Sequence, residues 1–237
     1  MLQRRYSIIL SLAFLTLGCA SQQPQTARHF TPCEDAAPYS KLEDSLCAKV
    51  AVPLSYSAGA DKITLFLRHY PALKKAQGDL WLLSGGPGES GAAFTANIDF
   101  FRATFPNHNL YIPDHRGTGF SSKLCEPEEA PQSPGGTALQ GAEWQSCFAG
   151  LHKNIKRTHS FTRHNAARDI STLIKTFSEG RPTFIYGVSY GTSLALEVSK
   201  VSGSAINGLI LDSLIPSPSD AEYGLSYHSF NANRVGT

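Results

Sequence analysis

One stretch decides the fold of this chain of 237 residues: Phe184-Ile185-Tyr186-Gly187-Val188-Ser189-Tyr190-Gly191-Thr192. Its apolar start suits a buried strand, and residues 194–201 carry apolar side chains at helical spacing. A chain that passes so quickly from strand to helix must turn sharply, and Gly187 and Gly191 leave room for that turn. The stretch therefore predicts a strained turn that holds Ser189 above the carboxyl edge of a sheet.

Ser189 is the candidate nucleophile, because the Gly-x-Ser-x-Gly pattern between strand and helix exposes a serine hydroxyl. The N–H of Tyr190, at the start of the predicted helix, points to where a carbonyl oxygen becomes negative during attack. A glycine-rich loop at 84–90 follows an apolar run, and we expect Gly86 to supply the second N–H donor. The alternatives are a structural serine and a phosphate-binding loop. No Lys-Ser or Lys-Thr follows the loop, which disfavours the second.

Strand patterns alternate with helical patterns along the chain. Strands are predicted at 48–54, 63–70, 80–83, 109–112, 182–186 and 206–211. Helices are predicted at 166–177, where Gly180 caps the carboxyl end, and at 194–201. This alternation predicts an α/β fold, a mostly parallel sheet with flanking helices. The Pro- and Gly-rich stretch 121–141 has no periodicity and predicts an irregular excursion.

Residues 1–18 are predicted to be a signal peptide, because a short basic stretch precedes an uncharged run that is too short to cross a bilayer. Residues 15–19, Leu-Thr-Leu-Gly-Cys, resemble the lipobox of bacterial lipoproteins. That resemblance implies cleavage before Cys19, acylation of Cys19, and an exported chain anchored by its lipid at the outer membrane. An ordinary signal peptide cleaved nearby is the alternative. Residues 19–30 are polar and predict a tether.

Charge and composition exclude several classes of protein. The chain has 21 Lys and Arg against 19 Asp and Glu, and removal of 1–18 takes away Arg4 and Arg5, which leaves 19 of each. A neutral mature chain lacks the basic face that nucleic-acid binding needs, so no nucleic-acid partner is predicted. A content of 41% hydrophobic and 17% charged residues is that of a globular protein, which excludes disordered, collagen-like and multi-span membrane chains.

Four of the five cysteines remain once Cys19 is set aside, namely Cys33, Cys47, Cys125 and Cys147. An even number in an exported chain predicts disulfides. Three pairings are possible. The pairing of sequence neighbours closes two short loops, each worth about 3 kcal/mol on the chain-entropy estimate. Zinc is disfavoured because the spacings are long and no paired CxxC or HxxxH accompanies them, so neither a metal nor another cofactor is predicted.

Several segments share their order and spacing with a known family. They are CAKVAVPL (47–54), GGPGES (85–90), DHRGTGFS (114–121), 166–173, YGVSYGTSLA (186–195) and LDS (211–213). Together they resemble α/β-hydrolases of the proline iminopeptidase and tripeptidyl aminopeptidase group over roughly 30–216. The resemblance implies an α/β-hydrolase fold and a serine peptidase that cuts near the amino ends of peptide substrates through an acyl-enzyme on Ser189. For Asp114 and Arg116 we expect structural salt bridges, because a glycine-rich turn needs anchoring.

The catalytic acid and base are the open question. Hydrolases of this fold place both after the nucleophile, and the only histidine after Ser189 is His228. Ser189, Asp212 and His228 have the right order, but the family carries its acid and histidine on later strands. We therefore expect 31–237 to be the amino-terminal part of a hydrolase domain that lacks the cap, acid and histidine, is inactive alone, and has a complementary half encoded downstream. The alternatives are a non-catalytic lipoprotein that binds a peptide or a partner, and an esterase or lipase.

Overall fold

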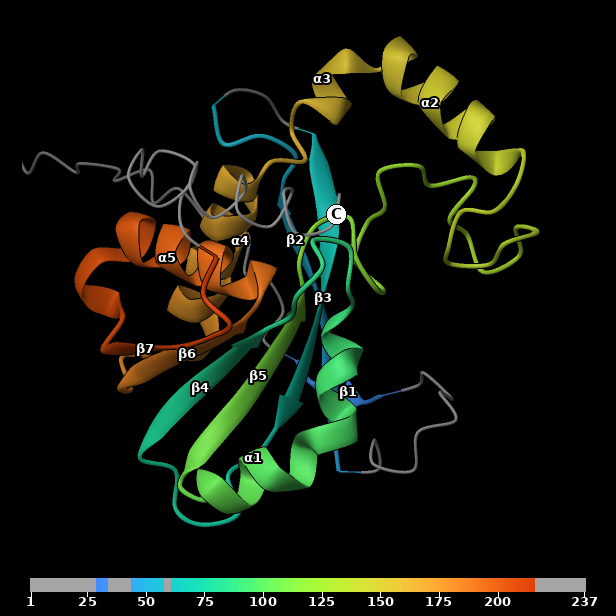
Figure 1. Cartoon of the computed structure of the whole chain (residues 1–237). Helices are drawn as coiled ribbons and strands as arrows, with labels where there is room; N and C mark the ends of the chain where they lie inside the picture. Colours follow the sequence, from blue (N-terminus) through green and yellow to red (C-terminus); the bar gives the residue numbers. More distant parts are fainter. Residues whose placement is uncertain (1–28, 34–43, 58–60, 216–237) are drawn as a thin grey trace, which may run out of the picture.

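A mixed sheet organises the computed structural model, which describes residues 29–33, 44–57 and 61–215. The described strands lie in the order β1-β2-β3-β5-β4-β6-β7 (Figure 1). They are β1 (Thr31–Pro32), β2 (Leu46–Pro53), β3 (Lys62–Tyr70), β4 (Gly78–Leu83), β5 (His108–Asp114), β6 (Thr183–Val188) and β7 (Gly208–Asp212).

The central strands are parallel and the amino-terminal ones antiparallel. β4 pairs in parallel with both β5 and β6, and β6 pairs in parallel with β7. β1, β2, β3 and β5 pair antiparallel in that order. The α/β class with a largely parallel sheet is thereby confirmed, and parallel pairing brings the carboxyl ends of β4, β6 and β7 to one edge.

The predicted strands all form, with shifted ends. β4 is buried along its whole length, as its apolar run predicted. β5 runs on through Pro113 to Asp114, although the sequence placed its end before Pro113. The pairing between β4 and β5 ends at Tyr111, so the missing N–H of Pro113 removes no hydrogen bond to β4.

Helices cover both faces of the sheet. α4 (Arg163–Phe177) and α5 (Tyr190–Ser202) pack together on the face that holds Trp81 and Leu83. The 3-10 helix η1 (Gly91–Asn97) and α1 (Ile98–Thr104) pack on the other face, against Leu80 and Leu82. Alternate residues of β4 thus supply two cores, as the pleat of a strand requires.

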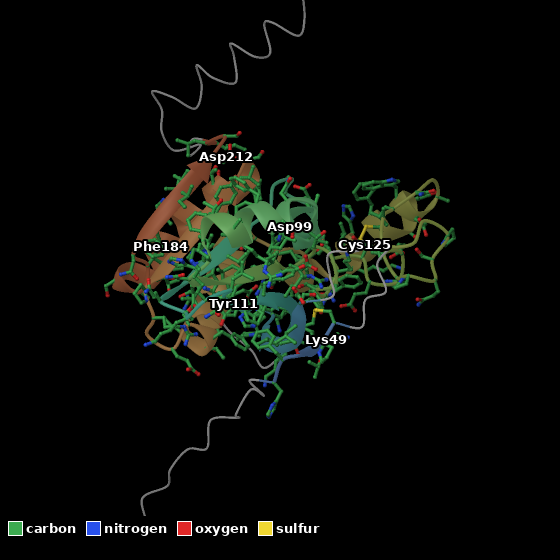
Figure 2. The ribbon with its side chains drawn as sticks, turned by 90° about the horizontal axis from the view of Figure 1, so that it is seen from below. Lys49, Asp99, Tyr111, Cys125, Phe184 and Asp212 are labelled. Carbon is green, nitrogen blue, oxygen red and sulfur yellow. A yellow bond between two sulfur atoms is a disulfide. The ribbon has the colours of Figure 1, made fainter. Side chains whose placement is uncertain are left out.

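Residues 121–160 form an excursion, here called the arm, between β5 and α4. Residues 121–141 contain no helix or strand, as predicted, and α2 (Glu143–Lys153) and α3 (Ile155–Thr158) follow. Both helices project away from the sheet (Figure 1). Seen from below, Cys125 lies out to one side of the body that holds Tyr111 and Phe184 (Figure 2). A short 3-10 helix η2 (Gly203–Ala205) links α5 to β7.

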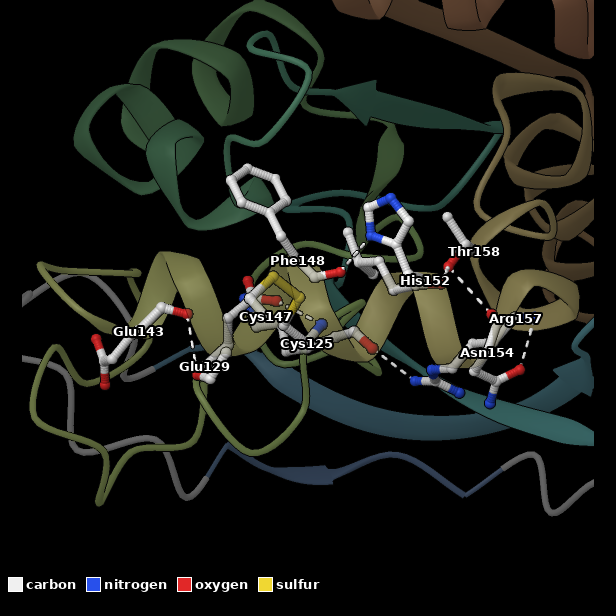
Figure 3. Close-up of a disulfide and its surroundings, with 12 residues drawn as sticks. Cys125, Glu129, Glu143, Cys147, Phe148, His152, Asn154, Arg157 and Thr158 are labelled. Atoms are coloured by element: carbon white, nitrogen blue, oxygen red, sulfur yellow. Dashed lines mark hydrogen bonds between the residues drawn. A yellow bond between two sulfur atoms is a disulfide. The ribbon is translucent and has the colours of Figure 1, made fainter.

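The disulfides join sequence neighbours, one of the three pairings left open. Cys33 bonds to Cys47 of β2, with Cα atoms 4.9 Å apart. Cys125 bonds to Cys147 of α2, with Cα atoms 5.4 Å apart (Figure 3). In the described ranges no three His, Cys, Asp or Glu side chains gather closely enough to hold a metal ion.

Several predicted features lie outside the described residues: the signal peptide 1–18, Cys19, most of the tether 19–30, and His228. Among the helices that the structure describes, none is long and apolar enough to cross a bilayer.

Candidate active site

Ser189 stands at the tip of the predicted sharp turn, between the end of β6 and the start of α5. Its backbone has φ 52° and ψ −119°, in the left-handed region that costs a residue with a side chain about 1–3 kcal/mol. Backbone bonds hold it there: Ser189 N–H donates to Asp212 O over 2.9 Å, and Ser189 O accepts from Thr192 N over 2.9 Å. The strain at this residue is therefore fixed by its neighbours on β7 and α5.

The two glycines of the motif stand where the backbone of the turn comes closest to other backbone. A Cβ added to Gly187 would lie 2.6 Å from the carbonyl carbon of Gly191. A Cβ added to Gly191 would lie 2.8 Å from Ser84 O and would overlap the carbonyl oxygen of Leu83. A side chain at Gly191 would push the turn away from the end of β4, and a side chain at Gly187 would push the end of β6 away from the start of α5.

The glycine-rich loop, residues 84–90, lies against the nucleophile as predicted. The Cβ position of Gly85 is 3.4 Å from the Cβ of Ser189. Gly86 has φ +107°, and a Cβ there would lie 2.6 Å from Glu89 N, so the loop requires glycine at this point. The structure thus brings the loop, Ser189 and Tyr190 together at the carboxyl edge of β4 and β6. Which N–H groups bind an oxyanion stays a prediction.

Asp114 ties this loop to the turn that follows β5. Its Oδ1 accepts from Ser90 Oγ over 2.8 Å and from Gly91 N over 2.7 Å, and its Oδ2 accepts from Phe120 N over 2.8 Å. The expected salt bridge of Asp114 is wrong, because all three donors are uncharged. Asp114 still has a structural role, because its carboxylate accepts hydrogen bonds from the backbone N–H groups of Gly91 and Phe120 and from the Ser90 hydroxyl.

Arg116 does make the expected structural salt bridge, with Asp169 of α4. Arg116 Nε and Nη2 donate to the two carboxylate oxygens over 2.7 Å each, and both side chains are buried. Arg116 Nη1 donates to Leu54 O and Ser160 O, and Tyr56 donates its hydroxyl proton to Asp169. Sequence reasoning missed Asp169, although a lone acid inside the apolar pattern 166–173 was a signal.

Asp212 ends β7, and its side chain is exposed. Tyr186 donates to Asp212 Oδ2 over 2.6 Å and Ser213 to Oδ1 over 3.1 Å. These two hydrogen bonds, first that of Tyr186, hold the pKa of Asp212 below its ordinary value. Burial and the nearby Asp212 raise the pKa of Tyr186 to about 12. Asp212 is therefore a carboxylate at neutral pH.

The structure brings Asp212 to the nucleophile through its backbone, but it does not complete a triad. His228 lies outside the described residues. Among the residues that are described, the Ser189 hydroxyl has no hydrogen-bond partner. The roles of Asp212 and His228 as acid and base thus stay predictions.

A cavity with a volume of about 430 Å³ opens beside Ser189, here called the acidic cavity. Its lining includes Ser84, Glu89, Phe101, Tyr186, Val188 and Asp212. It contains two carboxylates, Glu89 and Asp212, and no Lys or Arg among the described lining residues. Glu89 was not predicted as a site residue, because the sequence analysis interpreted the 84–90 loop only through its glycines and their backbone N–H groups.

This combination of fold, strained serine turn and glycine-rich loop defines a class of protein. Residues 80–229 match the family model described as the alpha/beta hydrolase fold. The chain therefore belongs to the α/β-hydrolase family.

Individual relatives include a protease. The chain is 24% identical to the Serine protease Hip1 of Mycobacterium tuberculosis H37Rv, over 91% of this chain and 46% of that protein, and the Mycobacterium bovis protein matches equally. The chain thus spans about half the length of the curated relatives it matches.

Two solved structures match part of the chain. A Bacillus coagulans carboxyl esterase is 19% identical with a TM-score of 0.44, over 70% of this chain and 43% of that one. A proline iminopeptidase-related protein of Thermus thermophilus is 19% identical with a TM-score of 0.41, over 70% of this chain and 44% of that one.

Proposed function

We propose that this protein is a serine hydrolase that removes residues or short peptides from the amino ends of peptides, with Ser189 as nucleophile. The observation that carries the proposal is the left-handed turn at Ser189, which places its hydroxyl at the sheet edge against the 84–90 loop. A backbone of this kind is strained, and strained residues cluster at functional sites, where the surrounding structure holds them in place.

The reaction follows from this placement. The Ser189 hydroxyl oxygen attacks the scissile carbonyl carbon, and the N–H groups of Tyr190 and Gly86 stabilise the negative oxygen. The C–N bond then breaks, and a general base passes the Ser189 proton to the leaving amine. Water hydrolyses the acyl-enzyme ester and frees the acid product. Asp212 and His228 are the sequence candidates for the acid and the base.

The acidic cavity supports a substrate with a free amino end. An α-ammonium group carries a positive charge at neutral pH, and Glu89 and Asp212 place negative charge next to Ser189. The 24% identity to a serine protease supports a peptide over a simple ester. An esterase could use the same acyl-enzyme chemistry, but these carboxylates would contribute nothing to an uncharged ester.

Labelling with a fluorophosphonate tests the nucleophile. Because the Ser189 hydroxyl has no hydrogen-bonded base among the described residues, we expect this chain to label slowly, and mass spectrometry should find the adduct on the peptide that contains Ser189. Ser189→Ala should lose the adduct, and Ser204→Ala, which changes an exposed serine after α5, should keep it. Labelling that survives in Ser189→Ala would contradict the proposal. Wild-type chain that binds peptide but never takes the label would favour the non-catalytic alternative.

Competition against the same label tests the substrate class. Trialanine amide with a free amino end should slow labelling about two- to fivefold more than its N-acetyl form, the scale of one partly exposed charge pair. Glu89→Gln should narrow that difference, because it removes one carboxylate of the acidic cavity. Equal competition by the two peptides would contradict the proposal that the enzyme recognises a free amino end. It would not affect the assignment of Ser189 as the nucleophile.

We also propose that the mature chain is exported and held at the outer membrane by a lipid on Cys19. The two disulfides support an oxidising compartment. We expect the wild type in the membrane fraction and Cys19→Ser in the soluble fraction, because the variant lacks the sulfur to which the lipid is bound. Ser21→Ala is the matched control and should stay with the membrane. A Cys19→Ser protein that remains there would contradict lipid anchoring.

A further inference from the structure

A second cavity, with a volume of about 380 Å³, lies between the arm and the body, and it is here called the arm cavity. Pro87, Gly88, His115 and Tyr190 line it from the body, and Trp144 and Phe148 line it from α2. Pro87 and Gly88 belong to the 84–90 loop, and Tyr190 follows Ser189. The two neighbours of Ser189 in the chain thus line different cavities, Val188 the acidic cavity and Tyr190 the arm cavity. The volume of the arm cavity falls in the range of about 300–1000 Å³ that is usual for ligand sites.

The arm presents large apolar side chains to this cavity. Trp144 is 49% exposed and Phe148 is 52% exposed. They lie one turn apart on α2, with ring centroids 5.8 Å apart. The only buried residue of α2 is Cys147, whose disulfide to Cys125 fixes the helix beside the cavity (Figure 3). Apolar surface in contact with water is unfavourable, so a ligand that covered these rings would gain free energy in proportion to the area it buries.

The floor of the cavity contains a buried ring nitrogen that makes no hydrogen bond of good geometry within the described part of the chain. His115 is 7% exposed, and its Nδ1 lies 3.1 Å from Arg116 O. A carbonyl oxygen only accepts, so Nδ1 carries the proton and Nε2 of the neutral ring is an acceptor. Nε2 is buried and makes no hydrogen bond of good geometry among the described residues, and the backbone of Pro87 also interacts with the His115 ring. An N–H of a ligand would satisfy it, and a buried polar atom normally has such a partner.

The charges around the arm cavity are compensated. Arg116 is bound to Asp169, and Glu129 accepts from Cys125 N over 2.9 Å. Arg163 and Glu129, the remaining charged lining residues, have opposite signs. The cavity thus offers aromatic surface and one acceptor rather than a net charge, which favours an uncharged apolar group over an anion or cation.

We propose that the arm cavity is the subsite for a large apolar side chain of the peptide substrate, with His115 Nε2 accepting a hydrogen bond from a backbone N–H of that peptide. This inference rests on the proposed function, because it takes the ligand to be a peptide that reaches Ser189. The arm then acts as a specificity element that selects among peptides, while the turn at Ser189 carries the chemistry.

Tryptophan fluorescence of the full chain tests the subsite. The chain has two tryptophans; Trp81 is buried, so iodide quenches mainly the exposed Trp144. In a Ser189→Ala background, Phe-Phe amide should protect Trp144 from iodide and bind about tenfold more tightly than Ala-Ala amide, since it buries more apolar surface. Phe148→Ala should raise the Kd of Phe-Phe amide about tenfold. Phe120→Ala, which removes an aromatic ring of similar exposure outside the cavity, should leave it unchanged.

His115→Phe should weaken Phe-Phe amide about three- to tenfold, the scale of one hydrogen bond. If Phe148→Ala and His115→Phe both bind Phe-Phe amide like the parent, or if bound peptide leaves iodide quenching of Trp144 unchanged, the subsite is overturned. These readouts need no acylation, so they stand even if Ser189 proves unreactive. Conversely, loss of the subsite would leave labelling of Ser189 untouched.

Discussion

At the scale of single residues, His69 shows how burial alters a titration. Its ring stacks on that of Tyr111, with centroids 4.6 Å apart, and Phe30 lies 4.9 Å away. Burial lowers the pKa of His69 to about 4, although Asn109 and Asp79 act in the opposite direction. Neither ring nitrogen has a hydrogen-bond partner of good geometry among the described residues, so nothing in the fold favours the charged form enough to restore the pKa.

Stability should therefore fall as the pH drops from about 6.5, the pKa of an unfolded histidine, to about 4, the pKa of folded His69. Between these two pH values His69 binds a proton in the unfolded chain and stays neutral in the folded chain. We expect His69 to cost on the order of 2 kcal/mol of unfolding free energy at pH 4.5 relative to pH 7, measured by urea denaturation.

His69→Phe keeps the ring stack and should remove most of this loss. A loss of the same sign should remain from His115, because burial lowers the pKa of that imidazole too. His159→Gln changes an exposed histidine and should leave the pH dependence as in the wild type. If His69→Phe loses as much stability as the wild type, the assignment to His69 fails.

Single residues were predictable where the backbone alone dictates them. Gly187, Gly191 and Ser189 follow from the turn, which any strand-to-helix reversal of this kind requires. Asp169 and Glu89 did not follow, because their importance depends on neighbours far along the chain. Arg116 and Asp169, for example, are 53 residues apart. A pattern within a short stretch of sequence cannot predict a partner that lies so far along the chain.

At the scale of elements, burial decided which helices the sequence could predict. α4 buries eight residues on one face, and Thr162 caps its start by accepting from Asn165 N, so its period was clear. α2 buries Cys147 alone, and its other apolar side chains face the arm cavity or solvent. Because α2 has no row of buried apolar residues, its sequence shows no helical periodicity from which the helix could be predicted. The arm therefore entered the sequence prediction only as an irregular excursion with a disulfide.

The Cys125–Cys147 disulfide should be the main support of the arm. We expect Cys125→Ser with Cys147→Ser to make residues 121–160 sensitive to limited proteolysis, because α2 has no other buried side chain. The bond is worth about 3 kcal/mol on the chain-entropy estimate, and we expect that loss to fall on the arm.

The matched control is Cys33→Ser with Cys47→Ser, which removes the other disulfide and should leave the cleavage pattern of the arm unchanged. An arm that resists proteolysis equally in both double variants would show that its packing, and not its disulfide, keeps it folded.

At the scale of the whole molecule, the sequence predicted the class of the fold but not the strand order. Alternating strands and helices indicated a parallel sheet. The placement of β5 between β3 and β4 depends on which way each crossover turns, and a linear pattern does not carry that information. The antiparallel pairing of β3 with β5 was equally hidden, although the residues of both strands were correctly recognised as strands.

The bond from Ser189 N–H to the carbonyl of Asp212 couples the nucleophile to β7, which pairs only with β6 in the described part of the chain. That amide proton can exchange with solvent only when the end of β7 separates from β6. Its exchange rate would therefore report how often the sheet frays at this edge. Each such opening also breaks one of the two backbone hydrogen bonds that hold the strained backbone of Ser189, so the same rate would report how often the nucleophile loses that support.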